Sequence, residues 1–207
     1  YAKGNGKNRI EIYEKSFEGQ EQSREKGYEQ VTPTIFALMA AVDAKDSFTF
    51  EHSENVSGYA MKLAAKMGLP KDDIQTAKVA GLLHDIGKIG VDEKILNKPG
   101  KLTKEEFEAM KQHTIIGARM LDSLEMYHDE EMMKYAYEIC RWHHERYDGK
   151  GYPDGLKGEE IPISAQVVSL ADAYDALVSD RVYKKAYSHE KAMEMILNGE
   201  CGVFNPL

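Results

Sequence analysis

Residues 51–68 read EHSENVSGYAMKLAAKMG, and their apolar positions repeat with the period of an α-helix. The repeating positions are Val56, Tyr59, Ala60, Leu63 and Met67. Spacings of three and four residues place these side chains on one side of a helix, and a glycine such as Gly68 typically terminates one. The stretch therefore predicts a helix over 50–67 that buries one face.

The same period recurs on both sides of this stretch. A Thr-Pro pair before 35–45 and a Thr-x-x-Glu capping box that begins at Thr103 are typical helix starts. Further helices are predicted over 72–88, 114–124, 130–144, 164–179 and 189–197. We find no convincing alternation of period two, which strands require. The predicted fold class is all-α.

Composition narrows the class of protein. The chain has 207 residues and is 42% hydrophobic, which is enough for one main domain with a buried core. Its longest apolar runs, such as 35–42, are far shorter than the roughly 20 residues that span a bilayer, and we see no secretory signal. Only Cys140 and Cys201 occur, without C-x-x-C spacing, so no disulfide framework is predicted. We expect a cytoplasmic protein without direct membrane contact.

The net charge of -8 argues against binding to long nucleic acids, since that affinity comes from many Lys and Arg contacts to phosphates. A small anionic ligand is compatible with local positive charge. The chain begins at Tyr1 without Met, so we expect it to be a fragment.

Histidines and carboxylates fall on predicted buried faces. His52 shares the apolar stripe of its helix, and the His84-Asp85 pair follows the face of the next predicted helix. A single core histidine is more often simply hydrogen-bonded. Several such groups in one core are costly unless something pairs with them, and a metal is the simplest partner. The candidate ligands are His52, His84, Asp85, His113, His143, His144 and Asp172.

Imidazole and carboxylate donors without thiolate favour Fe, Mn, Zn, Ni or Co over Ca. Seven candidates are enough for two ions that share a carboxylate. Paired metals about 3.5–4 Å apart can hold a bridging hydroxide that attacks phosphorus. Hydrolysis of a phosphate ester is therefore the predicted reaction class.

A long loop follows the last histidine pair. Residues 145–163 read ERYDGKGYPDGLKGEEIPI, with four glycines and two prolines. Loops of this length in compact domains are usually functional, although a solvated connector is the simpler interpretation. Arg146 either contacts substrate or pairs with Asp148 inside the loop, and Tyr152 adds an aromatic ring.

Three segments resemble the HD-GYP family of cyclic di-GMP phosphodiesterases. They are HDIGK at 84–88, HHERYDGKGYP at 143–153 and SLADAYDALVSDRVYK at 169–184, and the resemblance covers 32–207. It implies an all-α HD-domain helical bundle with a long GYP loop. It also implies metal-dependent hydrolysis of cyclic di-GMP, or of cyclic GMP-AMP, to pGpG, GMP or both.

The resemblance assigns roles to individual residues. The ligands of a first metal would be His52, His84, Asp85 and Asp172, and those of a second would be Asp85, His113, His143 and His144. Lys88, one turn beyond Asp85, would act on the reacting phosphate, whereas by itself it would count as a solvated lysine at a helix end. Arg181 and Lys184 would bind substrate phosphate, with Arg146 and Tyr152 nearby. Two divalent ions per chain are expected, with Fe or Mn first and Zn, Ni or Co as alternatives.

The first residues carry another resemblance. YAKGNGKNRIEIYE at 1–14 is similar to the closing segment of a GGDEF domain, although a flexible polar leader would look alike. The predicted organisation is a GGDEF-like tail over 1–16, a helical linker over 17–31, and the HD-GYP domain over 32–207, with a truncated C-terminal end as one interpretation. A GGDEF domain in the full-length chain is the expected partner, and a homodimer is also consistent with the sequence.

Two other functions compete with this reading. A single-metal HD nucleotide hydrolase would leave His113, the His143-His144 pair and the GYP loop without a role. A catalytically silent cyclic dinucleotide receptor would be expected to lack a ligand or Lys88.

The sequence also bears on a third metal, which some family members bind through a glutamate one turn before the first histidine. That position is Phe48, which cannot ligate, and Glu51 is turned about 100° from His52. Two metals are therefore predicted, and neither Glu51 nor Glu54 is expected to ligate.

Overall fold

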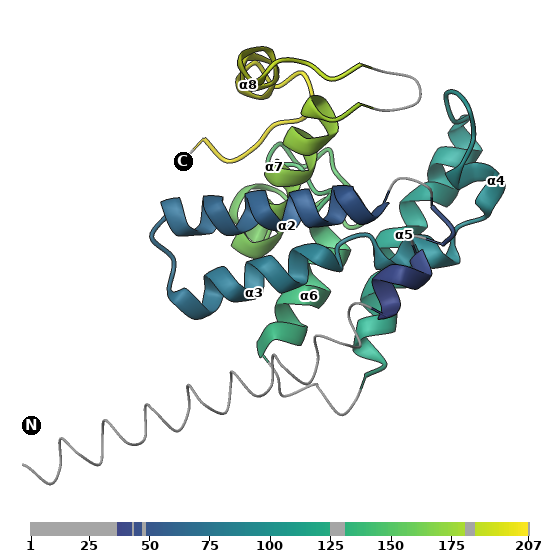
Figure 1. The fold of residues 1–207 in the computed structure, drawn as a ribbon, viewed down its shortest axis with the longest axis horizontal. Coiled ribbons are helices and arrows are strands. Elements are labelled where there is room, and N and C mark those ends of the chain that lie inside the picture. Colours follow the sequence, from purple (N-terminus) through teal and green to yellow (C-terminus); the bar gives the residue numbers. More distant parts are fainter. Residues whose placement is uncertain (1–36, 43, 47–48, 125–130, 181–184, 207) are drawn as a thin grey trace, which may run out of the picture. The chain divides into compact units, whose positions relative to one another are not determined.

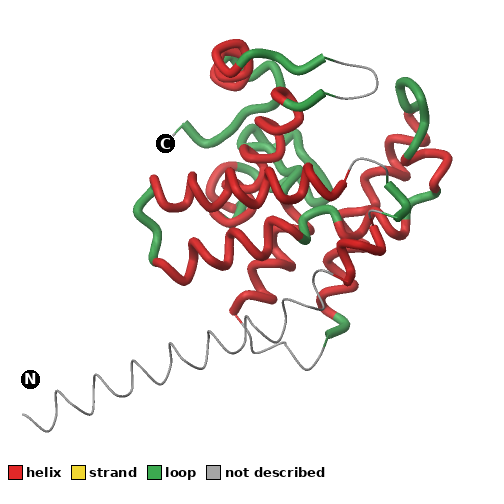
Figure 2. Tube along the Cα trace, viewed as in Figure 1, coloured by secondary structure: helices red, strands yellow, loops and turns green. Residues whose placement is uncertain are grey.

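The computed structural model describes residues 37–42, 44–46, 49–124, 131–180 and 185–206. The chain divides into two units, 1–37 and 38–207, and all but the last residue of the first unit lie outside the described part. The predicted GGDEF-like tail, the linker and the Thr-Pro helix start therefore fall outside it. Figure 2 shows helices and loops, without a strand, in the described ranges, which confirms the all-α class.

Helices follow one another along the described chain. In chain order they are α2 (Thr49–Lys66), α3 (Lys71–Leu82), η1 (Ile86–Gly90), α4 (Glu93–Leu96), α5 (Lys104–Asp122), α6 (Glu131–Trp142), η3 (Gly158–Glu160), α7 (Ile163–Val178) and α8 (His189–Leu197). Residues 37–42 are also helical. Figure 1 shows α2 and α3 side by side, with the chain reversing between them at Gly68, whose φ of 74° suits glycine.

The core lies where α6 and α7 meet the α2–α3 pair. α2 packs against α3 and α7, and α6 packs against α3, α5 and α7. Val56 and Ala60 of α2, Ala80 of α3, Ile139 of α6 and Val168 of α7 are fully buried there. The predicted apolar stripe of α2 is confirmed in its first half, while Met67, just beyond the helix, is 46% exposed.

One predicted helix is wrong in its second half. The period predicted a continuous helix over 72–88, but α3 ends at Leu82 and the tighter η1 begins at Ile86. The reason is a close backbone approach: a side chain on Gly87 would overlap the His113 carbonyl and the Gly117 amide of α5. His84 and Asp85 therefore lie at a break between two helices.

Two other predicted boundaries also change. The capping box at Thr103 is confirmed, but it opens one helix, α5, that also takes in the separately predicted 114–124 as far as Asp122. The helix predicted over 130–144 ends at Trp142, although the His143 amide still donates to the carbonyl of Ile139. His143 and His144 thus stand on the turn that leaves α6 for the long loop.

α8 attaches to the rest through a small cluster of its own. Leu177 of α7 packs with Ala192 and Ile196 of α8. The Tyr174 hydroxyl lies 2.9 Å from His189 Nδ1 at the start of α8, and His189 is exposed.

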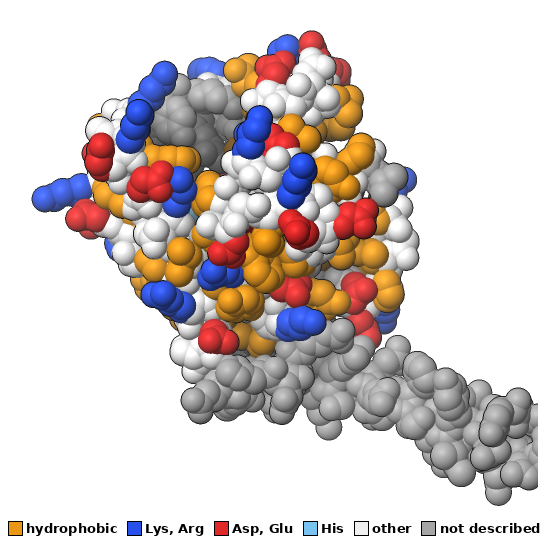
Figure 3. Space-filling model, turned by 180° about the vertical axis from the view of Figure 1, so that it is seen from behind, with side chains coloured by type: hydrophobic (Ala, Val, Ile, Leu, Met, Phe, Trp, Pro, Cys, Tyr) orange, Lys and Arg blue, Asp and Glu red, His pale blue; other side chains and the backbone are white. Residues whose placement is uncertain are grey.

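The described surface mixes charges of both signs. Figure 3 shows Lys and Arg side chains interspersed with Asp and Glu on one face rather than gathered by sign. Among the described helices, none combines the length and the apolar character that crossing a membrane requires.

Candidate metal centre

All seven predicted ligands converge on one place in the domain. His52 comes from α2, His84 and Asp85 from the break between α3 and η1, and His113 from α5. Asp172 comes from α7, and the histidine pair follows α6. Neighbouring imidazole rings lie 4.1 to 5.5 Å apart, namely His52–His84, His84–His143, His113–His143, His113–His144 and His143–His144.

The donor atoms form two overlapping groups. Within each group, one donor atom per residue lies within 4.8 Å of the others, and the groups are Asp85, His113, His143 and His144, and His52, His84 and Asp85. Asp172 adjoins the second group, with Oδ1 3.2 Å from Nε2 of His52. Asp85 is the residue that the two groups share.

Three of the histidines are held in one orientation by backbone carbonyls. Nδ1 of His84, His113 and His143 lies 2.7 to 2.8 Å from the carbonyl oxygens of Gly81, Met110 and Ile139, respectively. Each Nδ1 therefore carries the proton, and each Nε2 presents a lone pair to the centre.

These Nε2 atoms test whether the residues fit a metal. All three, together with Oδ1 of Asp85, are buried without a hydrogen-bond partner. Such atoms are rare in folded proteins because each costs desolvation free energy. They belong to the two donor groups that meet at Asp85, where divalent cations would satisfy them, so the site fits metal.

Asp85 turns one oxygen to each group. Its Oδ1 lies 3.3 Å from Nε2 of His113 and 3.8 Å from Nε2 of His143. Its Oδ2 lies 3.2 Å from Nε2 of His84 and 2.8 Å from Nζ of Lys88. Asp85 is therefore the carboxylate that faces both groups of imidazoles.

Burial sets the charge of the centre. Desolvation lowers the pKa of His113, lowers that of His143 well below the usual range, and brings that of His144 to about 4. Burial opposes ionisation of Asp85, but Lys88 and His84 hold its pKa well below the usual value. Neutral imidazoles beside an ionised carboxylate are the forms that bind metal.

Asp175 is a site residue that was not predicted from the sequence. Its Oδ2 accepts a hydrogen bond of 2.7 Å from Nδ1 of His52, and its Oδ1 accepts one of 3.1 Å from Ser179. Burial lowers the pKa of His52, but Asp172 and Asp175 together raise it to about 9. The signal available was a second carboxylate three residues after Asp172 on the same apolar helix face.

Lys88 lies beside the bridging carboxylate and is held from two sides. Its Nζ is 2.8 Å from Oδ2 of Asp85 and 3.4 Å from Oδ2 of Asp46, a buried residue that was not predicted. Desolvation lowers the pKa of Lys88, but Asp85 and Asp46 raise it above its ordinary value. Lys88 therefore keeps a fixed positive charge at the centre.

The long loop packs onto the centre. Tyr152 stacks on His144, with ring centroids 4.8 Å apart and planes 30° apart. The buried Glu145 accepts hydrogen bonds from the amides of Asp154 (2.7 Å) and Gly155 (2.9 Å). A side chain on Gly151 would overlap the backbone of Glu145, so the loop folds back tightly on its own first residue.

Other predicted residues have different surroundings. Arg146 pairs with Asp148, at 3.0 Å between Nη2 and Oδ2, so the ion pair within the loop is present. Glu51 and Glu54 are exposed and belong to neither donor group. Arg181, Lys184 and Phe48 fall outside the described residues.

Comparison with known proteins places these motifs in a family. The family model described as the HD domain matches residues 37–201. A probable cyclic di-GMP phosphodiesterase of Vibrio cholerae is 40% identical over 183 residues, which cover 84% of this chain and 42% of the relative. A cyclic di-GMP phosphodiesterase of Thermotoga maritima is 38% identical over 190 residues, which cover 90% of this chain and 50% of the relative. The chain thus spans half or less of the length of these curated relatives.

A solved structure supports the fold independently. The crystal structure of a cyclic GMP-AMP-specific phosphodiesterase of V. cholerae aligns with a TM-score of 0.59 at 17% identity, over 84% of this chain and 45% of that chain. At this identity the likeness concerns the helical arrangement alone.

Proposed function

The chain belongs to the HD-domain family, and on that premise we propose that it is a metal-dependent phosphodiesterase of cyclic di-GMP, with cyclic GMP-AMP as the alternative substrate. The observation that carries the proposal is the pair of donor groups that meet at Asp85. The names of the relatives support a cyclic dinucleotide as the substrate class.

The centre is proposed to hold two divalent ions. His52, His84, Asp85 and Asp172 would hold the first, and Asp85, His113, His143 and His144 the second. Nitrogen and oxygen donors without a thiolate favour Fe or Mn, with Zn, Ni and Co as alternatives. Such ions, when bound, supply Lewis-acid charge and lower the pKa of a water.

The chain's own residues would then position the phosphate. Lys88 keeps its positive charge beside Asp85, so it is placed to stabilise charge on the reacting phosphate or to protonate the departing ribose oxygen. Arg181 and Lys184 are proposed to bind phosphate as charge-assisted donors. Tyr152 and Arg146 are proposed to line the substrate side of the loop, and Arg146 would exchange its partner Asp148 for a ligand.

Product analysis tests this proposal against its two competitors. Protein purified without oxygen and loaded with Fe²⁺ or Mn²⁺ should contain two ions per chain and convert cyclic di-GMP to pGpG or GMP, as seen by mass spectrometry. One ion per chain with activity on mononucleotides would support the single-metal hydrolase. Two ions with binding but no turnover of either cyclic dinucleotide would support the receptor.

A further inference from the structure

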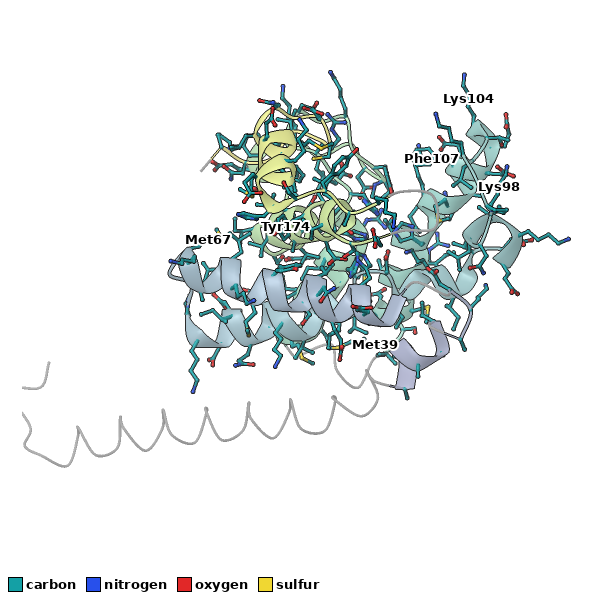
Figure 4. All side chains as sticks on the ribbon, turned by 45° about the horizontal axis from the view of Figure 1, so that its top comes forward. Met39, Met67, Lys98, Lys104, Phe107 and Tyr174 are labelled. Atoms are coloured by element: carbon teal, nitrogen blue, oxygen red, sulfur yellow. The ribbon has the colours of Figure 1, made fainter. Side chains whose placement is uncertain are left out.

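Phe107 is an exposed aromatic residue that is connected to the metal centre through Tyr152. It lies on the first half of α5, and 46% of its surface is open to solvent. Figure 4 shows it at the opposite end of the domain from Met67, which is equally exposed. A single exposed ring is common at protein surfaces, so the neighbours of Phe107 decide whether it could bind anything.

Two ring contacts connect Phe107 to a proposed metal ligand. Its ring lies 6.1 Å from that of Tyr152, edge to face at 81°, and Tyr152 in turn stacks on His144. A nucleotide places its base one sugar away from its phosphate. A phosphate at the centre would therefore bring a base within reach of these outer rings.

Lys111 adds a cation at the same place. Its Nζ lies 5.2 Å from the ring centroid of Phe107 and 5.5 Å from that of Tyr152. It also pairs with Glu108 at 2.6 Å, but Glu108 is 67% exposed, and ion pairs at such surfaces are weak. The ammonium group can therefore exchange this partner for a ligand.

We propose that Phe107 and Lys111, with Tyr152 behind them, form a subsite for one guanine base of the substrate. The aromatic ring supplies a stacking surface, which every base can use. Lys111 supplies selectivity, because guanine offers two acceptors, O6 and N7, where adenine offers a donor in place of O6. The inference rests on the proposed function and adds that the enzyme prefers cyclic dinucleotides that contain guanine.

Substitution of Phe107 tests the stacking surface. Base stacking is worth about 1–3 kcal/mol, so Phe107→Ala should raise KM for cyclic di-GMP about tenfold, while kcat and metal content stay within about twofold. Phe107→Trp should retain the KM of the wild type. Met67→Ala is the matched control, because it removes an equally exposed apolar side chain far from the centre. An unchanged KM for Phe107→Ala in an active enzyme overturns the subsite and leaves the proposed function standing.

Lys111→Met tests the selectivity with a readout that needs no turnover. Binding of the phosphorothioate analogues of cyclic di-GMP and cyclic di-AMP to metal-loaded protein is measured by calorimetry. The variant should lose about tenfold of the preference for the guanine compound and keep its metal content. A preference that does not change overturns the role of Lys111. If neither analogue binds to the wild type, both the subsite and the proposed function are overturned.

Discussion

The histidines of the centre are held in two different ways. His84, His113 and His143 donate from Nδ1 to carbonyl oxygens of the chain itself. His52 and His144 depend on side chains instead, since Asp175 bonds His52 and Tyr152 stacks on His144. We call these the backbone-held and the side-chain-held histidines.

The difference shows where the centre can be altered by single substitutions. A carbonyl that orients a ligand cannot be removed by changing a side chain, so the backbone-held histidines respond only to shifts of the chain. The side-chain-held histidines have supports that one substitution deletes. Partners that orient metal ligands in this way typically contribute 10- to 100-fold to metal affinity or activity.

Asp85→Ala should have the largest effect, because Asp85 belongs to both donor groups. Its loss should disable the backbone-held and the side-chain-held histidines alike. We expect turnover of cyclic di-GMP to be abolished and metal content to fall below one ion per chain. Elemental analysis and an activity assay check this, with circular dichroism as the control for folding. Near-normal turnover would show that the centre does not need a bridging carboxylate.

Gly87→Ala should affect the backbone-held histidines. The added methyl group overlaps the His113 carbonyl and the Gly117 amide, so η1 must move away from α5. Overpacking of this kind costs about 1–3 kcal/mol, which lowers Tm by several degrees in a chain of this size. Metal content should fall as well, because Asp85 moves relative to His113. Gly58→Ala is the matched control, since an added methyl group there meets nothing within 4 Å. Equal Tm values for the two variants would contradict the close packing.

Much of this centre could be predicted from the sequence because its candidate ligands are histidines and aspartates, residue types that are uncommon in a core. Histidines such as His52, placed on apolar helical stripes, needed no tertiary information to be recognised as buried. The break after Leu82 could not be found in this way, since the apolar period continues through it and its cause is a contact between Gly87 and a helix far along the chain. Asp46 shows the same limit, because only the fold brings it to Lys88.

The side chains that hold His52 and His144 could not be identified from the sequence either. Asp175 follows Asp172 by three residues on α7, and its contact with His52 depends on which way α7 turns toward α2. Tyr152 was recognised as a loop aromatic, but its stacking on His144 depends on how closely the loop approaches the histidine turn. In both cases the sequence shows a residue type that suits a functional site, but it does not show which histidine that residue contacts.

Asp175→Ala should weaken the first metal selectively. Without the carboxylate, Nδ1 of His52 loses its acceptor, so metal affinity on the side of His52 should fall 10- to 100-fold. Titration against a chelator should remove one ion early and leave the second with the affinity of the wild type. Asp175→Asn should restore part of the loss, since its amide oxygen can still accept. Ser179→Ala, which touches only the other oxygen of Asp175, should change little. Equal loss of both ions would mean a general structural defect.

Tyr152→Leu should give the smallest effect, because it removes a stacking contact rather than a hydrogen bond. Aromatic pairs are worth about 0.5–1.5 kcal/mol beyond their burial, so the affinity for the second metal should fall only a few-fold. Tyr152→Phe retains the ring and should bind metal like the wild type, which separates stacking from any role of the hydroxyl. Chelator titration of the second ion checks both variants. A loss in the phenylalanine variant equal to that in the leucine variant would assign the support of His144 to the hydroxyl, and His144 would then be held by a polar contact, as His52 is.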